Sequence, residues 1–356
     1  MKTMKRDSEM KKTYLMFMLA GATAATAHAQ SSVAVYGSID AGLRYQTNVN
    51  AAGDGLLTVG SGNYYSNRLG FRGIEDLGGG MKARFTLESG FVSKSGALDN
   101  TSGVLFNRTA LLGIGGDWGA IDVGRLYTIA FRTELFLDPF DHHYTGIVPL
   151  SSGAGTTLPD IAKNAGLSAS SSSGTRFNNS VQYSRTSGPL TVRAEYAASE
   201  IAGKGAAQAA GFTYAGSPWL LAAAYTQKET AAGFDNHAYV AGGGFKGRTT
   251  TFKVGHARER QATASAGEYR NRTTWAGASH NVTPALEVTL AAYRSRFDSL
   301  ASGGRRDLLL LGGAYALSRR TNLYAELDLN RYQGALIPAS GKERQRGASF
   351  GINCLF

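Results

Sequence analysis

The sequence has a single cysteine, Cys354, and only 7 prolines among its 356 residues. One cysteine excludes an intrachain disulfide, so no disulfide framework can hold this fold together. Beyond residue 29, no stretch approaches the roughly 18 consecutive apolar residues that a membrane-spanning helix needs. Amphipathic helical patterns are nearly absent as well, which argues against an exported α/β enzyme.

What the chain does contain is glycine and aromatic residues, with 46 Gly, 17 Tyr and 16 Phe, at a mean hydropathy of -0.18. This profile is typical of an outer-membrane β-barrel, because only half of the residues in each strand touch lipid. The formal net charge is +11. Without residues 1–29 the formal net charge is (37 − 5) − (26 − 2) = +8, so the remaining chain is still basic.

Residues 1–29 have the order of a secretory signal: a basic head, an apolar run at Tyr14–Ala25 and a small-x-small end at Ala27–Ala29. We expect cleavage before Gln30, with residues 30–356 forming one transmembrane β-barrel domain. A membrane anchor is the alternative, but the apolar run is short for a spanning helix.

Strict alternation of apolar and polar residues is the main structural signal. From Val33 to Tyr45, apolar side chains take every second position, with Tyr36, Asp40 and Arg44 among the residues between them. Met81–Phe91 repeats the pattern. Successive side chains of a strand point to opposite faces, so one face suits lipid and the other suits water.

Sixteen segments qualify as strands, and their connections alternate between short and long. The predicted strands are 33–45, 65–74, 81–91, 104–115, 119–127, 175–185, 189–198, 208–215, 219–228, 236–245, 249–259, 269–280, 285–295, 306–317, 321–332 and 345–356. Short connections such as Ser187-Gly188 carry turn residues, whereas long ones such as Gln46–Tyr64 are largely polar loops. The pattern predicts an all-β, closed antiparallel transmembrane β-barrel of about 16 strands, with all short turns at one rim.

The last strand alternates up to Phe356, so it can pair with the first strand and close the sheet. Closure is required in lipid, because an open edge leaves backbone groups without hydrogen-bond partners.

The connection at 128–174 is by far the longest, and loops of that length in a compact domain usually carry function or are disordered. Its first half combines aromatic residues with Glu134, Asp138 and Asp141. We expect the aromatic residues to favour packing inside the barrel, which makes this third long loop a candidate for folding into the lumen.

Basic residues gather at positions that alternation places in the lumen. The predicted pore-lining set is Arg68, Arg72, Lys82, Arg84, Arg108, Arg176 and Arg193, with the strand phase of Arg108 ambiguous. The alternative is ordinary solvated charge with no special effect. Opposite charges across a narrow water column create a transverse field, which orients dipolar solutes. The basic wall and the +8 balance favour weak anion selectivity.

Several blocks resemble the general porins of Gram-negative bacteria, in particular the trimeric type of beta-proteobacteria. They are Ser32–Gly42, Asn67–Phe91, Asn107–Gly115, Gly119–Tyr127, Arg176–Val181 and Leu317–Tyr324. The likeness is strongest before Tyr127. The chain departs from the family at its end, where Asn353-Cys354-Leu355 replaces the usual basic pair.

The resemblance implies a homotrimer in the bacterial outer membrane that lets small hydrophilic solutes and ions diffuse passively. It also implies contact with outer-membrane lipid and lipopolysaccharide, and a third loop that constricts the lumen. By resemblance, arginines at Arg68, Arg108 and Arg176 form a basic ladder that faces the acidic residues of that loop.

Two other readings stay open. An outer-membrane barrel hydrolase needs a nucleophile motif, and no Gly-x-Ser-x-Gly elbow accompanies the histidines. An adhesin or binding protein would act through its long loops. His142-His143 are adjacent histidines without a companion ligand cluster, so we predict no metal site. We also predict no catalytic residue, no cofactor and no nucleic-acid partner, because the charges form no binding module.

Overall fold

The fold is known from a computed structural model, which describes residues 32–100, 103–144, 175–199, 205–229, 233–262, 267–298 and 303–356. The predicted secretory segment, residues 1–29, lies outside these ranges. No helix in the described part of the chain is long and apolar enough to cross a membrane.

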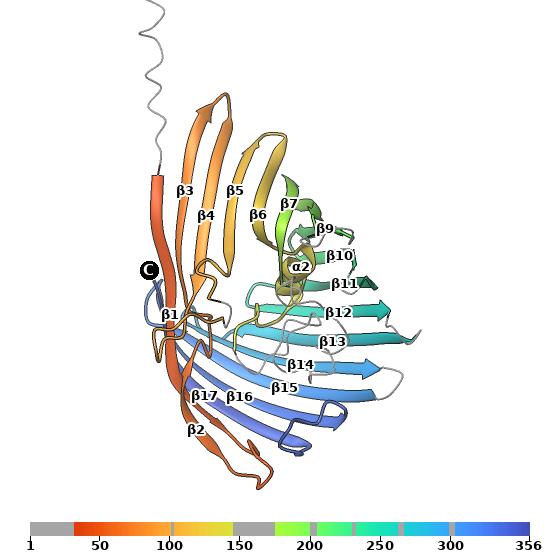
Figure 1. The fold of residues 1–356 in the computed structure, drawn as a ribbon. Helices are drawn as coiled ribbons and strands as arrows, with labels where there is room; N and C mark the ends of the chain where they lie inside the picture. Colours follow the sequence, from red (N-terminus) through yellow and green to blue (C-terminus); the bar gives the residue numbers. More distant parts are fainter. Residues whose placement is uncertain are drawn as a thin grey trace, which may run out of the picture.

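The described residues form one antiparallel sheet of 17 strands and one helix (Figure 1). The strands are β1 (Ser32–Gln46), β2 (Leu56–Ser61), β3 (Arg68–Gly78), β4 (Met81–Gly90), β5 (Thr109–Gly116), β6 (Gly119–Tyr127), β7 (Arg176–Ser187), β8 (Leu190–Ala197), β9 (Ala207–Ala215), β10 (Trp219–Glu229), β11 (Asp235–Lys246), β12 (Thr250–Ala262), β13 (Glu268–Asn281), β14 (Leu286–Asp298), β15 (Gly303–Ala316), β16 (Thr321–Gly334) and β17 (Arg344–Leu355). The helix is α2 (Ile129–Leu137).

The sheet closes on itself at β1. One edge of β1 pairs with β17, from Ser38↔Leu355 onward. The other edge pairs first with β3 and then, from Ala41, with the short strand β2. Because β2 and β3 lie in line along the same edge of β1, they take one place in the ring, which therefore has 17 − 1 = 16 strand positions. The predicted closed barrel is confirmed.

Two elements depart from the sequence prediction. The polar connection at 46–64 contains β2, and the long connection contains α2. In addition, β5 begins at Thr109 rather than at residue 104, so Arg108 lies in the preceding loop and not in a strand. Boundaries shift here because the side-chain pattern does not specify where a strand leaves the ladder.

Alternation along each strand separates an outward face from an inward one. On β15, Leu309 and Leu311 are 43% and 41% exposed, whereas Leu308 and Leu310 between them are 2% and 0% exposed. The exposed apolar set forms the outside of the barrel, which suits lipid. The opposite face is the inner face, which is turned towards the lumen.

The largest buried apolar cluster lies inside the barrel, between the long connection and the wall. Ile129 and Leu137 of α2, with Phe140 and Tyr144 beyond it, pack against inward side chains of β9–β16. Many of these wall side chains are small. A Cβ on Gly211 would lie 2.7 Å from Ile129 Cγ2, so only glycine lets the helix come this close. Residues 145–174 lie outside the described ranges.

Candidate functional site

Hydrogen bonds fix both ends of α2, and those at its end come from the barrel strands. Thr128 caps the start of the helix by accepting from the Phe131 amide at 3.2 Å. Past the other end, Lys253 Nζ donates to the Asp138 carbonyl at 2.9 Å. Trp275 Nε1 likewise donates to the Leu137 carbonyl at 3.0 Å. Carbonyls at the end of a helix lack partners within the helix, so these bonds supply what the helix cannot.

Glu88 on β4 gathers basic residues from neighbouring elements. Its side chain accepts from Arg108 Nε at 2.8 Å and lies 3.8 Å from the Arg68 guanidinium. The Tyr36 hydroxyl donates to the same carboxylate at 3.0 Å. Glu88 is 5% exposed, so this carboxylate is held by its partners rather than by bulk water.

Tyr127, at the end of β6, gathers three arginines. Its hydroxyl accepts from Arg176 at 2.6 Å and from Arg108 at 3.1 Å. The guanidinium carbons of Arg176 and Arg132 lie 4.2 and 5.8 Å from its ring centre, within the range of cation–π attraction. We call Arg108, Arg132, Arg176 and Tyr127 the Tyr127 cluster. Arg132 comes from α2, so the cluster joins the wall to the long connection.

A bulge places Tyr127 in this cluster. The pairing of β6 with β7 shifts between Gly124 and Leu126, which changes the direction of the side chains that follow. Gly124 has φ +132°, and a Cβ there would lie 2.1 Å from the Ala110 carbonyl oxygen. The backbone at the bulge therefore requires glycine at residue 124. The bulge in turn determines the position of Tyr127.

Arg68, Arg108 and Arg176 are thus brought together by Glu88 and Tyr127. The other predicted basic residues share the inner face but have different neighbours. The guanidinium carbon of Arg72 lies 5.1 Å from the centre of the Tyr36 ring, and Lys82 is exposed. Arg84 donates two hydrogen bonds to Asp122, at 2.8 and 2.7 Å. Arg193 donates to the Thr213 hydroxyl at 3.4 Å.

The three acidic residues of the long connection have partners other than the arginine ladder. Glu134 is 2% exposed and Asp138 is 0% exposed. Asp138 accepts from the Tyr293 hydroxyl at 2.5 Å, and Asp141 pairs with Lys253 at 2.7 Å. The carboxylates in ion pairs with Arg68 and Arg108 come from Glu88 and Asp99 instead.

Burial shifts the pKa of two groups in this segment. The pKa of Glu134 is raised well above its ordinary value by burial, with further contributions from the carboxylates of Glu259 and Asp138. Burial also lowers the pKa of His143 to about 4. His143 packs against Tyr64 and Tyr65. Within the described ranges, no group of three or more His, Cys, Asp or Glu side chains is placed to hold a metal ion.

Glu88 and Tyr127 were not singled out from the sequence. Glu88 shares the inward phase of Lys82 and Arg84, so its face was predictable. Its partners were not, because they depend on the register of β3, β4 and the loop before β5. The sequence did contain a signal for the packing of α2 against the barrel. Inward positions on β9–β12 carry small residues such as Ala209 and Ala224, where charged lumen residues are otherwise expected.

Comparisons with known proteins agree with this architecture. A family model described as Gram-negative porin matches residues 16–335. Outer membrane porin protein 32 of Delftia acidovorans is 28% identical over 368 residues, which cover 98% of this chain and 100% of that protein. An outer membrane porin of Bordetella pertussis is 34% identical over 190 residues, 49% of this chain and 44% of the relative.

The solved structures give the same result. An anion-selective porin from Comamonas acidovorans has a TM-score of 0.78 at 25% identity, covering 92% of this chain and 100% of that chain. OmpT of Vibrio cholerae, lacking loop L8, has a TM-score of 0.70 at 13% identity, over 92% and 99% of the two chains. This chain therefore belongs to the Gram-negative porin family, whose barrels form water-filled diffusion channels in the bacterial outer membrane.

Proposed function

We propose that this porin passes small hydrophilic solutes with a weak preference for anions, and that the Tyr127 cluster sets the preference. Four arginines, Arg68 and the three of the Tyr127 cluster, are linked through Glu88 and Tyr127, and one of them, Arg132, lies on α2 itself. Arg68 and Arg108 form ion pairs with Glu88, and Arg108 also pairs with Asp99. Partial burial strengthens the field of such a group, because less water screens it.

We further propose that the segment from α2 to Tyr144 narrows the pore. Its packing against the inner face supports this role, since a helix there displaces water from the lumen. Glu134 and Asp138 are buried and Asp141 is paired with Lys253. The segment therefore offers the passing solute little negative charge, whereas Arg132 adds a positive one. This excess of positive over negative charge supports a preference for anions over cations as permeating ions.

Reversal potentials across planar bilayers in a salt gradient test the proposal. The triple variant R68Q/R108Q/R176Q removes three charges from the site, so we expect its reversal potential to shift towards cations relative to the parent protein. The matched control R258Q/R296Q/R331Q removes three charges from the outward face, and we expect no shift. Equal potentials for the parent and the first variant would show that these arginines do not set selectivity.

We also propose that the protein assembles as a homotrimer and carries no catalytic activity. The trimer is supported by a neighbour of the same fold, because OmpT of Vibrio cholerae is described in a trimer form at a TM-score of 0.68. Light scattering of the detergent-purified protein is expected to give three chains per particle. Single-channel steps without hydrolysis of ester or peptide substrates are expected, and the reverse result would favour a barrel enzyme.

A further inference from the structure

A closed path of side-chain contacts joins the barrel wall to the long connection. On the side of the connection, the Phe131 ring stacks on the Tyr127 ring with 5.2 Å between their centroids. The His142 ring meets Phe131 at 5.1 Å, and the neighbouring His143 ring meets Tyr65 at 5.0 Å. We call Tyr65, Tyr127, Phe131, His142 and His143 the aromatic side. None of them belongs to the pore-lining set predicted from the sequence.

Arginines close the path from the opposite side. The Arg68 guanidinium lies over the Tyr65 ring at 4.2 Å and 3.8 Å from the Glu88 carboxylate. Arg108 pairs with the same carboxylate at 2.8 Å and donates to the Tyr127 hydroxyl at 3.1 Å. The path thus leaves Tyr65 through the aromatic side and returns from Tyr127 through the two arginines.

The members of this path border water rather than forming a packed cluster. All residues of the aromatic side and both arginines are partly exposed, although they lie inside the barrel. The Arg68 side chain, for example, is 17% exposed. The barrel wall with its adjoining loops supplies one half of the path and the connection supplies the other. The exposed surfaces therefore border an opening of the lumen between these two halves.

The connection presents rings to this opening instead of carboxylates. Glu134 and Asp138 are buried, and Asp141 pairs with Lys253 at 2.7 Å. Burial lowers the pKa of His143 to about 4, so its ring is neutral at pH 7. The opening therefore has one cationic side and one uncharged aromatic side.

The backbone that carries the two histidines is strained. Asp141, His142 and Tyr144 have φ of 50°, 57° and 74°, a left-handed conformation that is uncommon outside glycine. The His142 amide donates to the Asp138 carboxylate at 2.6 Å. The Tyr144 amide donates to the Tyr64 carbonyl at 2.9 Å. These bonds hold the turn, and strain of this kind gathers where a structure positions groups for a ligand.

We infer that this opening favours solutes that carry an anionic group on an aromatic ring, with the anionic group on Arg68 and the ring against the aromatic side. Guanidinium groups bind carboxylates, and aromatic rings attract one another beyond the effect of buried area alone. An aliphatic anion would use only the arginine, and a neutral aromatic solute would use only the rings. The inference rests on the proposed anion preference of this site and adds the solute class to it.

Flux into proteoliposomes tests the inference with three sulfonates, which stay ionised and so do not cross lipid as neutral acids. Benzenesulfonate and cyclohexanesulfonate carry the same charge on rings of similar size, and propanesulfonate is a narrow reference. Both ring fluxes are divided by that of propanesulfonate. In the parent protein we expect the relative flux of benzenesulfonate to exceed that of cyclohexanesulfonate by about twofold to tenfold.

The Phe131 variants test the aromatic side directly. F131L removes the ring but keeps an apolar side chain, so the relative flux of benzenesulfonate is expected to fall towards that of cyclohexanesulfonate. F131Y keeps the ring and is expected to keep the parent ratio. The control F136L makes the same change on the same helix, at a residue that packs against the buried apolar cluster, and we expect the parent ratio there as well.

A mere widening of the opening predicts a different result. If F131L acts through width, the relative flux of cyclohexanesulfonate would rise while that of benzenesulfonate would not fall, and this outcome would overturn the inference. Equal fluxes of the two ring sulfonates through the parent protein, or the parent ratio in F131L, would overturn it too.

The reversal potential separates this inference from the proposed function. The parent ratio in F131L, together with the expected shift in R68Q/R108Q/R176Q, would refute the aromatic preference alone. A reversal potential that does not shift in the triple variant would refute the proposed function instead, and with it the part of the inference that concerns Arg68.

Discussion

At the scale of single residues, the strand alternation predicts the face of a side chain but not its partner. The inward positions of Arg68 and Glu88 follow from counting along one strand. Their contact depends on the antiparallel register of β3 with β4, which no local pattern specifies. Arg108 shows the limit most clearly. It precedes its strand, so alternation assigns it no face, yet its side chain reaches Glu88 at 2.8 Å.

Glu134 gives a prediction for pH dependence. Burial raises its pKa above the unfolded value, so its contribution to the packing of α2 is fully present below about pH 4.3 and is lost as the pH rises through the folded pKa. The variant E134Q removes this titration. We expect hydrogen exchange of the α2 amides, corrected for intrinsic rates, to depend less on pH in E134Q than in the parent protein.

The control for this experiment is D141N, which removes a carboxylate of the same connection that is paired and 61% exposed at its side chain. Its α2 amides should keep the parent pH dependence. Equal pH profiles for the parent and E134Q would mean that the pKa of Glu134 is the same whether α2 is packed or open, which would contradict the prediction.

At the scale of elements, the barrel strands were predictable and the inner elements were not. In a strand between lipid and water, apolar and polar residues alternate strictly, because one face contacts lipid and the other contacts water. The sequence of α2 shows no amphipathic pattern, because apolar residues such as Ile129, Phe131 and Leu135 lie on all sides of the helix. The short strand β2 lies beside one edge of β1 and carries too few residues for alternation to stand out.

Leu137 tests how α2 is held. It is 0% exposed in the main apolar cluster, and L137S both leaves a cavity and buries a hydroxyl, at a cost of about 3 kcal/mol or more. We expect the segment to leave the wall, so single-channel conductance rises while the barrel stays folded. On the same helix, Leu135 is 36% exposed, and L135S should leave conductance unchanged. Equal conductance in both variants would argue against a constricting role for α2.

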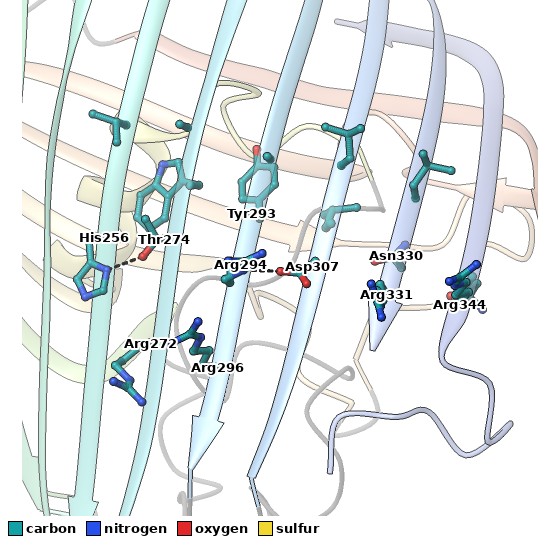
Figure 2. A pocket seen from close by; sticks show the side chains of 18 of the residues that line it. His256, Arg272, Thr274, Tyr293, Arg294, Arg296, Asp307, Asn330, Arg331 and Arg344 are labelled. Atoms are coloured by element: carbon teal, nitrogen blue, oxygen red, sulfur yellow. Dashed lines mark hydrogen bonds and ion pairs between the residues drawn. The ribbon is translucent and has the colours of Figure 1, made fainter. Parts of the chain in front are cut away.

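At the scale of the whole molecule, the two faces of one sheet use arginine differently. The Tyr127 cluster places guanidinium groups on the inner face, whereas β13 and β14 carry others, Arg272 and Arg296, side by side on the outward face (Figure 2). Alternation keeps these two sets on opposite sides of a single layer of backbone. Loss of the inward set should therefore shift the reversal potential, whereas loss of the outward set should leave it unchanged.

Closure of the barrel also depends on particular side chains at one seam. Arg44 on β1 reaches past β17 to β16, where it donates to Asp328 at 2.9 Å and lies 3.5 Å from Glu326. On the closing strand, Asn353 donates to the Ser38 hydroxyl at 2.8 Å. Asn353 belongs to the stretch that departs from the usual basic pair of the family, and it bonds across the seam without adding charge.

The Arg44 pairs predict how strongly the seam contributes to stability. Arg44 is 8% exposed, so R44A leaves two buried carboxylates without their cation and is expected to cost about 3–5 kcal/mol of unfolding free energy. The control R84A breaks the pair with Asp122, in which the arginine side chain is 42% exposed, and should cost less than about 1 kcal/mol. Urea titration, followed by the shift in gel mobility between folded and unfolded barrel, measures both. If the seam closes through backbone pairing alone, R44A and R84A would have the same midpoint, because Arg44 would then contribute no more to stability than Arg84.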